Sequence, residues 1–292
     1  MKKKVITICA ALLFLTALGL TLYPPISNYV NRRYASEIQT AYRELIQQTD
    51  DSVLEEARQQ AIAYNLAITP GTSNAYSEEQ LVSAAEKYNS QLDIAGNGIM
   101  GYVEIPKIQV NLPIYHGTEA EVLDRGIGHL LGSSLPVGGE NTHAVLSGHS
   151  GMASQKMFTD LEQLTPGDVF YLNVLNETLA YQVTKINTVL PYETDFLGIV
   201  PGADLCTLVT CTPYGVNTHR LLVRGSRIPY EEAAVLEEEN TVTEPTASTW
   251  EAKYLQGVLW GVAAALGSGV IILTGTRIYR MARKGGVRYG KK

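Results

Sequence analysis

Residues 205–220 read Leu-Cys-Thr-Leu-Val-Thr-Cys-Thr-Pro-Tyr-Gly-Val-Asn-Thr-His-Arg, two apolar runs around a centre rich in turn residues. Two β-like runs joined in this way predict a hairpin. Its midpoint falls between Gly215 and Val216, so we expect Cys211 and Arg220 to lie roughly opposite each other at the mouth of the loop. A thiol beside a guanidinium that stays charged marks a place where negative charge can be stabilised.

A histidine follows another strand-like run. Residues 145–151 read Val-Leu-Ser-Gly-His-Ser-Gly, so His149 comes where small residues turn the chain. Each of these side chains also has a purely structural interpretation. His149 would then be a turn residue, Cys211 a small buried hydrophobe and Arg220 the partner of a surface carboxylate. Cys211 fits that interpretation poorly, because it ends a strand directly before a polar turn.

The order His149, Cys211, Arg220 in these two contexts resembles the sortase family of transpeptidases. Four more segments fall where that family has its early strands: residues 100–108, 112–118, 128–130 and 134–139. The resemblance covers roughly residues 98–228 and is greatest to the class C, pilus-building sortases. It implies a mainly β fold, a closed barrel, and we expect its strands near residues 101–105, 111–115, 142–147, 168–174, 179–190, 204–211 and 219–226.

The resemblance also implies a chemistry. In sortases Cys is the nucleophile, His the general acid and Arg the group that stabilises the oxyanion, and these roles map onto Cys211, His149 and Arg220. Class C enzymes cleave a Leu-Pro-x-Thr-Gly sorting motif between Thr and Gly and transfer the acyl group to a lysine of another pilin subunit. We expect Thr210 to help shape the substrate cleft, and we expect no cofactor and no metal.

Other functions remain open at this point. A sortase could instead anchor surface proteins to peptidoglycan, water could resolve the acyl-enzyme, or the chain could be a tethered binding module with an incidental Cys. His143, His149 and Cys211 are also zinc-ligand residue types, although the sequence gives no sign that they cluster. The identity of the acceptor separates the enzymatic alternatives.

Class C enzymes usually carry a lid before the barrel, with an Asp-Pro-aromatic motif that covers the active Cys. No such tripeptide occurs between Asn31 and Gly98. The aromatic residues in the corresponding region, 66–92, are Tyr76 and Tyr88. We expect either an open groove or a lid of different construction, with Tyr76 as the plug.

Both ends of the 292-residue chain are unlike its middle. Residues 5–23 are almost wholly apolar after three lysines. Residues 255–276 are also apolar, and they precede a tail that contains seven basic residues. Since positive flanks stay in the cytoplasm, we expect both termini inside, two transmembrane helices and an extracytoplasmic middle. The expected parts are a signal or membrane anchor (1–30), a helical region with a lid-equivalent segment (31–97), the barrel (98–229), an acidic flexible stalk (230–250), a transmembrane helix (251–276) and a basic tail (277–292).

Charge and cysteine content narrow the function further. Three of the 23 basic residues precede the first apolar segment and seven follow the second, while all 29 acidic residues lie between, so the middle carries a net charge of −16. That charge argues against a nucleic-acid partner. Cys206 and Cys211, five residues apart on one strand, would have Cα atoms about 16 Å apart, too far for a disulfide. We therefore expect Cys206 in the core.

Overall fold

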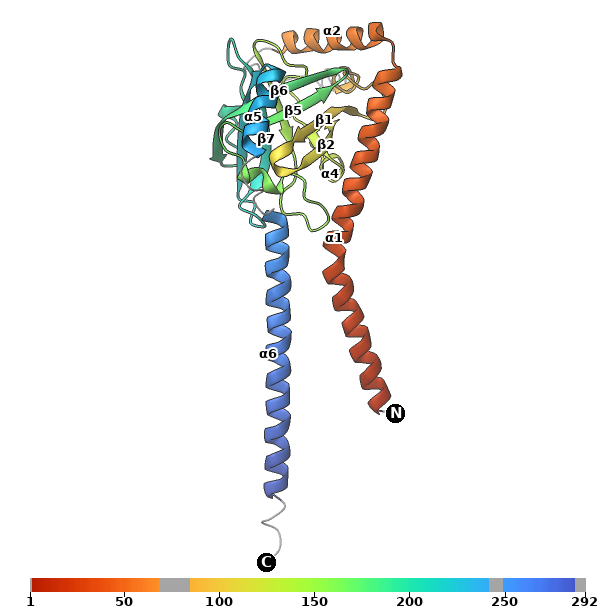
Figure 1. The fold of residues 1–292 in the computed structure, drawn as a ribbon, viewed down its shortest axis with the longest axis vertical. Coiled ribbons are helices and arrows are strands. Elements are labelled where there is room, and N and C mark those ends of the chain that lie inside the picture. Colours follow the sequence, from red (N-terminus) through yellow and green to blue (C-terminus); the bar gives the residue numbers. More distant parts are fainter. Residues whose placement is uncertain (1, 69–84, 242–248, 287–292) are drawn as a thin grey trace, which may run out of the picture. The chain divides into compact units, whose positions relative to one another are not determined.

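The computed structural model describes residues 2–68, 85–241 and 249–286, and the chain forms two units, Met1–Thr246 and Ala247–Lys292. The first unit holds a closed β-barrel (Figure 1). Its strands are β1 (Ile99–Ile105), β2 (Val110–His116), β3 (Ile127–His129), β4 (Thr142–Ser147), β5 (Val169–Val174), β6 (Glu177–Val189), β7 (Asp204–Thr212) and β8 (His219–Ile228). Around the barrel they follow the order β1-β2-β3-β4-β7-β8-β6-β5, and β5 pairs with β1 to close it.

The barrel interior is filled by apolar side chains from alternate strand positions. Leu146 of β4 and Leu208 of β7 lie opposite each other in a parallel pair, and both are fully buried in the main core. Cys206, two residues before Leu208 on the same face, belongs to that core, as predicted. The seven predicted strands are confirmed. The eighth, β3, has only three residues, too few to show an alternating pattern.

Two long helices precede the barrel. The first, α1 (Lys2–Gln48), continues through Pro24 and Pro25, so the boundary expected at residue 30 is not the end of an element. Its second half lies against β1 and β2 (Figure 1), where the Tyr42 hydroxyl donates to the carbonyl of Met100 at 3.1 Å. The second helix, α2 (Asp51–Ala67), begins with an N-cap bond from Ser52 N–H to the Asp50 carboxylate. The region expected to be helical from residue 31 therefore contains the second half of α1 and the whole of α2.

Helix α2 is held to the barrel by a buried amide. The Asn65 side chain accepts from the Leu135 N–H at 2.7 Å and donates to the Leu135 carbonyl at 3.1 Å. Arg58 adds an ion pair to Glu177 on β6 at 3.0 Å. These contacts link the helical region to the barrel at several points along its length.

The part of α1 from Ala11 to Gln48 is long and apolar enough to cross a membrane, and its apolar window is not buried against the protein. It is the one helix of this kind among the described residues. The second unit contains helix α6 (Thr249–Gly286), which does not meet the same criterion over its described part. The transmembrane role expected for residues 251–276 thus remains a prediction.

The segment after the barrel differs from expectation. Residues 230–250 were predicted to form a flexible stalk, but α5 (Tyr230–Thr241) is a helix packed on the barrel. Ala233 is fully buried beside Tyr171 and Ala180, and the Tyr171 hydroxyl donates to the Glu237 carboxylate at 2.7 Å. The acidic composition of this segment gave no sign of the small apolar face through which the helix packs on the barrel.

Candidate active site

Cys211 and Arg220 lie at the open end of the β7–β8 hairpin. Strands β7 and β8 are antiparallel, and their register pairs Cys211 directly with Arg220. The juxtaposition predicted from the sequence is therefore confirmed. Cys211 is partly exposed, whereas Cys206 on the same strand is buried. The hairpin thus brings one thiol to the protein surface beside a guanidinium.

His149 follows β4, which runs parallel to β7. Their register pairs Ser147 with Val209, and the Gly148 N–H donates to the Val209 carbonyl at 3.0 Å. His149 and Cys211 each lie two residues beyond this pair, so the register places them at the same end of the sheet. Backbones of adjacent strands lie about 4.8 Å apart, so the imidazole and the thiol come from neighbouring chain segments.

The glycines around His149 are required by close packing. A Cβ on Gly148 would lie 2.7 Å from side-chain atoms of both Ile127 and Phe158. Gly151 has a φ of +76°, which favours glycine, and a Cβ there would lie 3.3 Å from the backbone nitrogen of Gly215 in the β7–β8 loop. The loop that carries His149 therefore approaches the loop between Cys211 and Arg220 closely.

Arg220 is held by backbone carbonyls. Its Nη1 donates to the carbonyl of His219 at 3.1 Å and is 3.4 Å from that of Asn217. Among the described residues it forms no ion pair with a carboxylate, in contrast to the structural interpretation offered by the sequence. Its positive charge is therefore available to another anion.

One residue near the site was not predicted. The Asp124 carboxylate lies 3.6 Å from His149 Nε2, and both side chains reach solvent. The carboxylate therefore lies close enough to the imidazole to interact with it electrostatically. Asp124 follows a short helix, α4 (Ala120–Leu123), 25 positions before His149, and no local sequence pattern connects the two residues.

The remaining histidines have structural partners. Burial lowers the pKa of His129 to about 4 and also lowers the pKa of His143. Both ring nitrogens of His143 are engaged, by the Gly198 carbonyl at 2.8 Å and the Thr207 hydroxyl at 2.7 Å. Within the described ranges no group of three His, Cys, Asp or Glu side chains is arranged to hold a metal ion. His143 is thus committed to the fold and not to a site with Cys211.

The other two predicted site residues, Thr210 and Tyr76, have different outcomes. Thr210 is buried, with 3% of its surface exposed, and its hydroxyl donates to the Gly148 carbonyl at 2.7 Å. Thr210 therefore stabilises the turn before His149 through this hydrogen bond. Tyr76 lies outside the described residues. Tyr88, the other aromatic residue of that region, is buried, and its hydroxyl lies 2.8 Å from His129 Nδ1.

Comparison with known proteins identifies the family. The sortase domain model matches residues 103–228. The crystal structure of sortase C1 from Streptococcus agalactiae is 46% identical, covers 66% of this chain and 98% of its own, and superposes with a TM-score of 0.61. Sortase C of Streptococcus pneumoniae, whose structure is described as informative on pilin substrate specificity, is 42% identical over 66% of this chain and 97% of its own, with a TM-score of 0.58.

A more distant relative agrees with this assignment. Sortase A of Streptococcus agalactiae is 28% identical over 188 residues, which are 63% of this chain and 73% of that protein. The match to the domain model begins within β1 and ends with β8, so it spans the barrel and the three predicted catalytic residues. The chain belongs to the sortase family, with class C sortases as its structural neighbours, and is a cysteine transpeptidase.

Proposed function

We propose that this protein is a membrane-anchored pilus-assembling sortase. It cleaves an LPxTG-like sorting signal between Thr and Gly and transfers the acyl group to a lysine amine of another pilin subunit. The observation that carries the proposal is the pairing of Cys211 with Arg220. His149 follows β4, the strand that lies beside β7, at the same end of the sheet. The 40–46% identity to sortase C structures supports the choice of class C.

The proposed reaction begins with attack of the Cys211 thiolate on the Thr carbonyl carbon. Arg220 stabilises the negative charge that develops on the carbonyl oxygen. As the C–N bond breaks, His149 donates a proton to the leaving Gly amine, and a thioester remains. A lysine amine then attacks the thioester carbon, His149 takes up a proton from that amine, and the Cys211 thiolate leaves, which restores the starting state and forms an isopeptide bond.

The cellular arrangement is part of the proposal. The apolar N-terminal helix is consistent with a membrane anchor or a signal, and we place the barrel outside the cell with both termini in the cytoplasm. The partners are pilin subunits with C-terminal sorting signals. An acidic external domain, with a net charge of −16 between the two apolar segments, stays soluble close to an anionic cell envelope.

A matched pair of cysteine variants tests the chemistry. A sorting-signal peptide is incubated with the purified chain, and the intact mass is measured. We expect a thioacyl adduct with the wild type and with Cys206→Ala, because the Cys206 thiol is buried in the core, and no adduct with Cys211→Ala. An adduct in Cys211→Ala, or none in any protein, would contradict the proposal. Peptide that docks without any adduct would indicate a binding module.

The acceptor is tested in the second step. Purified pilin added to the adduct should give high-mass covalent ladders. A wall-precursor amine would give a single small conjugate instead, and release of the free peptide acid alone would indicate hydrolysis. Either of these results, without ladders, would contradict the pilin assignment while leaving the Cys211 chemistry intact.

The lid is tested by thiol accessibility. If Tyr76 covers the cleft, Tyr76→Ala should raise the rate at which a thiol reagent labels Cys211, because removal of the ring exposes the sulfur. Tyr23→Ala, a change in the membrane anchor, serves as a control and should leave the rate unchanged. Equal labelling rates for wild type and Tyr76→Ala would exclude Tyr76 as the plug.

A further inference from the structure

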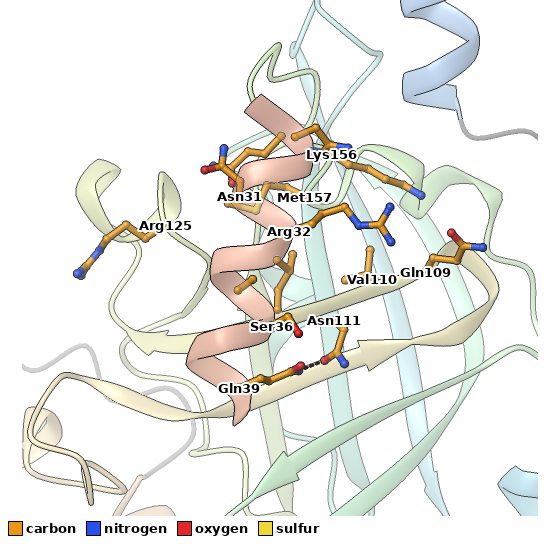
Figure 2. Close-up of a pocket in the computed structure, with 14 residues that line it drawn as sticks. Asn31, Arg32, Ser36, Gln39, Gln109, Val110, Asn111, Arg125, Lys156 and Met157 are labelled. Carbon is orange, nitrogen blue, oxygen red and sulfur yellow. Dashed lines mark hydrogen bonds between the residues drawn. The ribbon is translucent and has the colours of Figure 1, made fainter. Parts of the chain in front are cut away.

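A polar cavity of about 190 Å³ lies between α1 and the barrel (Figure 2). Its walls come from α1, from the turn into β2 and from the loop after His149, and the three predicted catalytic residues do not line it. Arg32, Arg125 and Lys156 line the cavity, and none of its lining residues is Asp or Glu. In a region with a net charge of −16, this wall is opposite in sign to its surroundings.

Two of the three cations already have partners. Lys156 forms an ion pair with the buried Asp160 at 2.7 Å. Arg125 lies over the ring of Tyr115 at 4.9 Å, and Figure 2 shows its side chain directed away from α1. Lys156 is therefore balanced by a carboxylate, and Arg125 is directed away from the side of the cavity that α1 forms.

Arg32 is the remaining cation. It is exposed on α1 and forms no ion pair among the described residues. Figure 2 shows its guanidinium extending toward the side where Gln109 and Lys156 lie. A planar guanidinium without a carboxylate partner, in a cavity that the Gln109 amide also lines, suits the binding of a phosphate group.

The position of Arg32 along α1 indicates the source of the phosphate. Residues 5–23 would span about 28 Å at helical rise, close to the thickness of the hydrocarbon core. Arg32 lies nine residues further, or about 14 Å along the axis, and a long side chain can reach back toward the interface. With α1 as the membrane anchor of the proposed function, the cavity opens near the lipid headgroups.

The cavity is also tied to the loop that carries His149. The Asn28 side chain accepts from the Lys156 N–H at 3.0 Å, and the Asn31 side chain donates to the Ser154 carbonyl at 3.1 Å. The same loop therefore leads from His149 to the wall of the cavity. A ligand held there would contact both α1 and this loop.

We propose that this cavity binds a phosphate ester, supplied by the headgroup of an anionic phospholipid, with Arg32 as its principal ligand. The shared chemistry is the phosphate group, which a soluble phosphate ester would also provide. The inference rests on the membrane anchorage in the proposed function. It adds a lipid-binding site to the face of the domain nearest the bilayer.

The test uses the full chain in an uncharged, phosphate-free detergent. It is titrated with dihexanoyl phosphatidylglycerol, with dihexanoylglycerol, which lacks the phosphate, and with glycerol 1-phosphate, while the thermal midpoint is followed. The variant is Arg32→Gln. The control is Arg33→Gln, which removes the same charge at the next exposed position but does not line the cavity. Midpoints without ligand verify that both variants are folded.

We expect a saturable rise with phosphatidylglycerol and none with dihexanoylglycerol. Half-saturation should need about tenfold more lipid in Arg32→Gln, since a charge-assisted bond is lost, and should be unchanged in Arg33→Gln. Equal saturation by glycerol 1-phosphate would support the phosphate site with a soluble source. The inference would be overturned if the midpoint does not saturate with lipid, or if Arg32→Gln and Arg33→Gln weaken lipid binding equally. It would also be overturned if an acidic peptide displaces the lipid with greater affinity.

Adduct formation at Cys211 is measured in the same wild-type preparation. An adduct without phosphate binding would overturn this inference alone. Phosphate binding without an adduct would overturn the proposed enzymatic function alone.

Discussion

Arg220 lies at the start of a strand, where its backbone is fixed and its guanidinium stays charged. Its backbone is fixed by pairing on both sides, to Cys211 in β7 and to Val189 in β6. Its side chain bonds to backbone carbonyls, which orient the guanidinium without neutralising it. In the proposed mechanism, a guanidinium held in this way would need little reorganisation when the oxyanion forms, and preorganised donors of this kind are commonly worth a factor of about 10²–10³ in rate.

Thr210 provides a test of the support beneath His149. In Thr210→Val the bond from the hydroxyl to the Gly148 carbonyl is lost, and the buried carbonyl is left without that donor, at a cost of about 1–3 kcal/mol in the free energy of unfolding. We expect kcat for transpeptidation to fall about three- to tenfold, because the turn that positions His149 loosens, while KM changes little.

Thr210→Ser is the matched control for this prediction. It keeps the donor and should keep most of the activity. Steady-state kinetics with a sorting-signal peptide at a temperature where all three proteins are folded would check the result. If the Val and Ser variants have the same kcat, Thr210 acts only through packing.

Among the helices and strands, α5 is the element that the sequence did not predict, because its residues were expected to form a flexible stalk. We expect Ala233→Glu to destabilise the protein by about 2–4 kcal/mol, because a carboxylate would be forced into the buried contact with Tyr171 and Ala180. Ala234→Glu adds the same charge at the next position, which is exposed, and should change stability by less than about 0.5 kcal/mol. Denaturant unfolding of both variants would measure the difference, and equal destabilisation would contradict the docking of α5.

The elements that could be predicted are those whose pattern is local. The Cys211–Arg220 hairpin was predictable because turn residues and two apolar runs fix its midpoint. The long strands β6 and β7 were predictable because each is an extended run rich in apolar and β-branched residues. Strand β3 was indicated only by the family resemblance of residues 128–130, because three residues carry no period. Helix α5 was missed because one buried alanine among acidic residues gives no apolar stripe. Asp124 joins His149 only through the tertiary fold, so no spacing in the sequence could indicate it.

At the scale of the whole molecule, His129 connects the segment before the barrel to the sheet. It is fully buried, its Nε2 lies 2.8 Å from the Ser134 carbonyl, and its Nδ1 faces the Tyr88 hydroxyl at 2.8 Å. The Tyr88 hydroxyl also accepts from the Gly117 N–H at 3.0 Å. The Tyr88 hydroxyl also lies 3.0 Å from the His129 carbonyl. Burial lowers the pKa of His129 to about 4 and so favours the neutral imidazole, with Nε2 donating to the Ser134 carbonyl.

This arrangement predicts a loss of stability in mild acid. The pKa of His129 falls from about 6.5 in the unfolded chain to about 4 in the fold, mainly because burial disfavours the charged ring. The stabilisation is complete above pH 6.5 and is lost as the pH falls from 6.5 toward 4, since only the unfolded chain takes up the proton in that window. The contribution is about 3 kcal/mol. We expect the free energy of unfolding to decline across this range, and in His129→Asn, less stable at neutral pH, to decline by less. Denaturant titrations at several pH values would measure both slopes; equal slopes would show that His143 or other groups control the acid sensitivity.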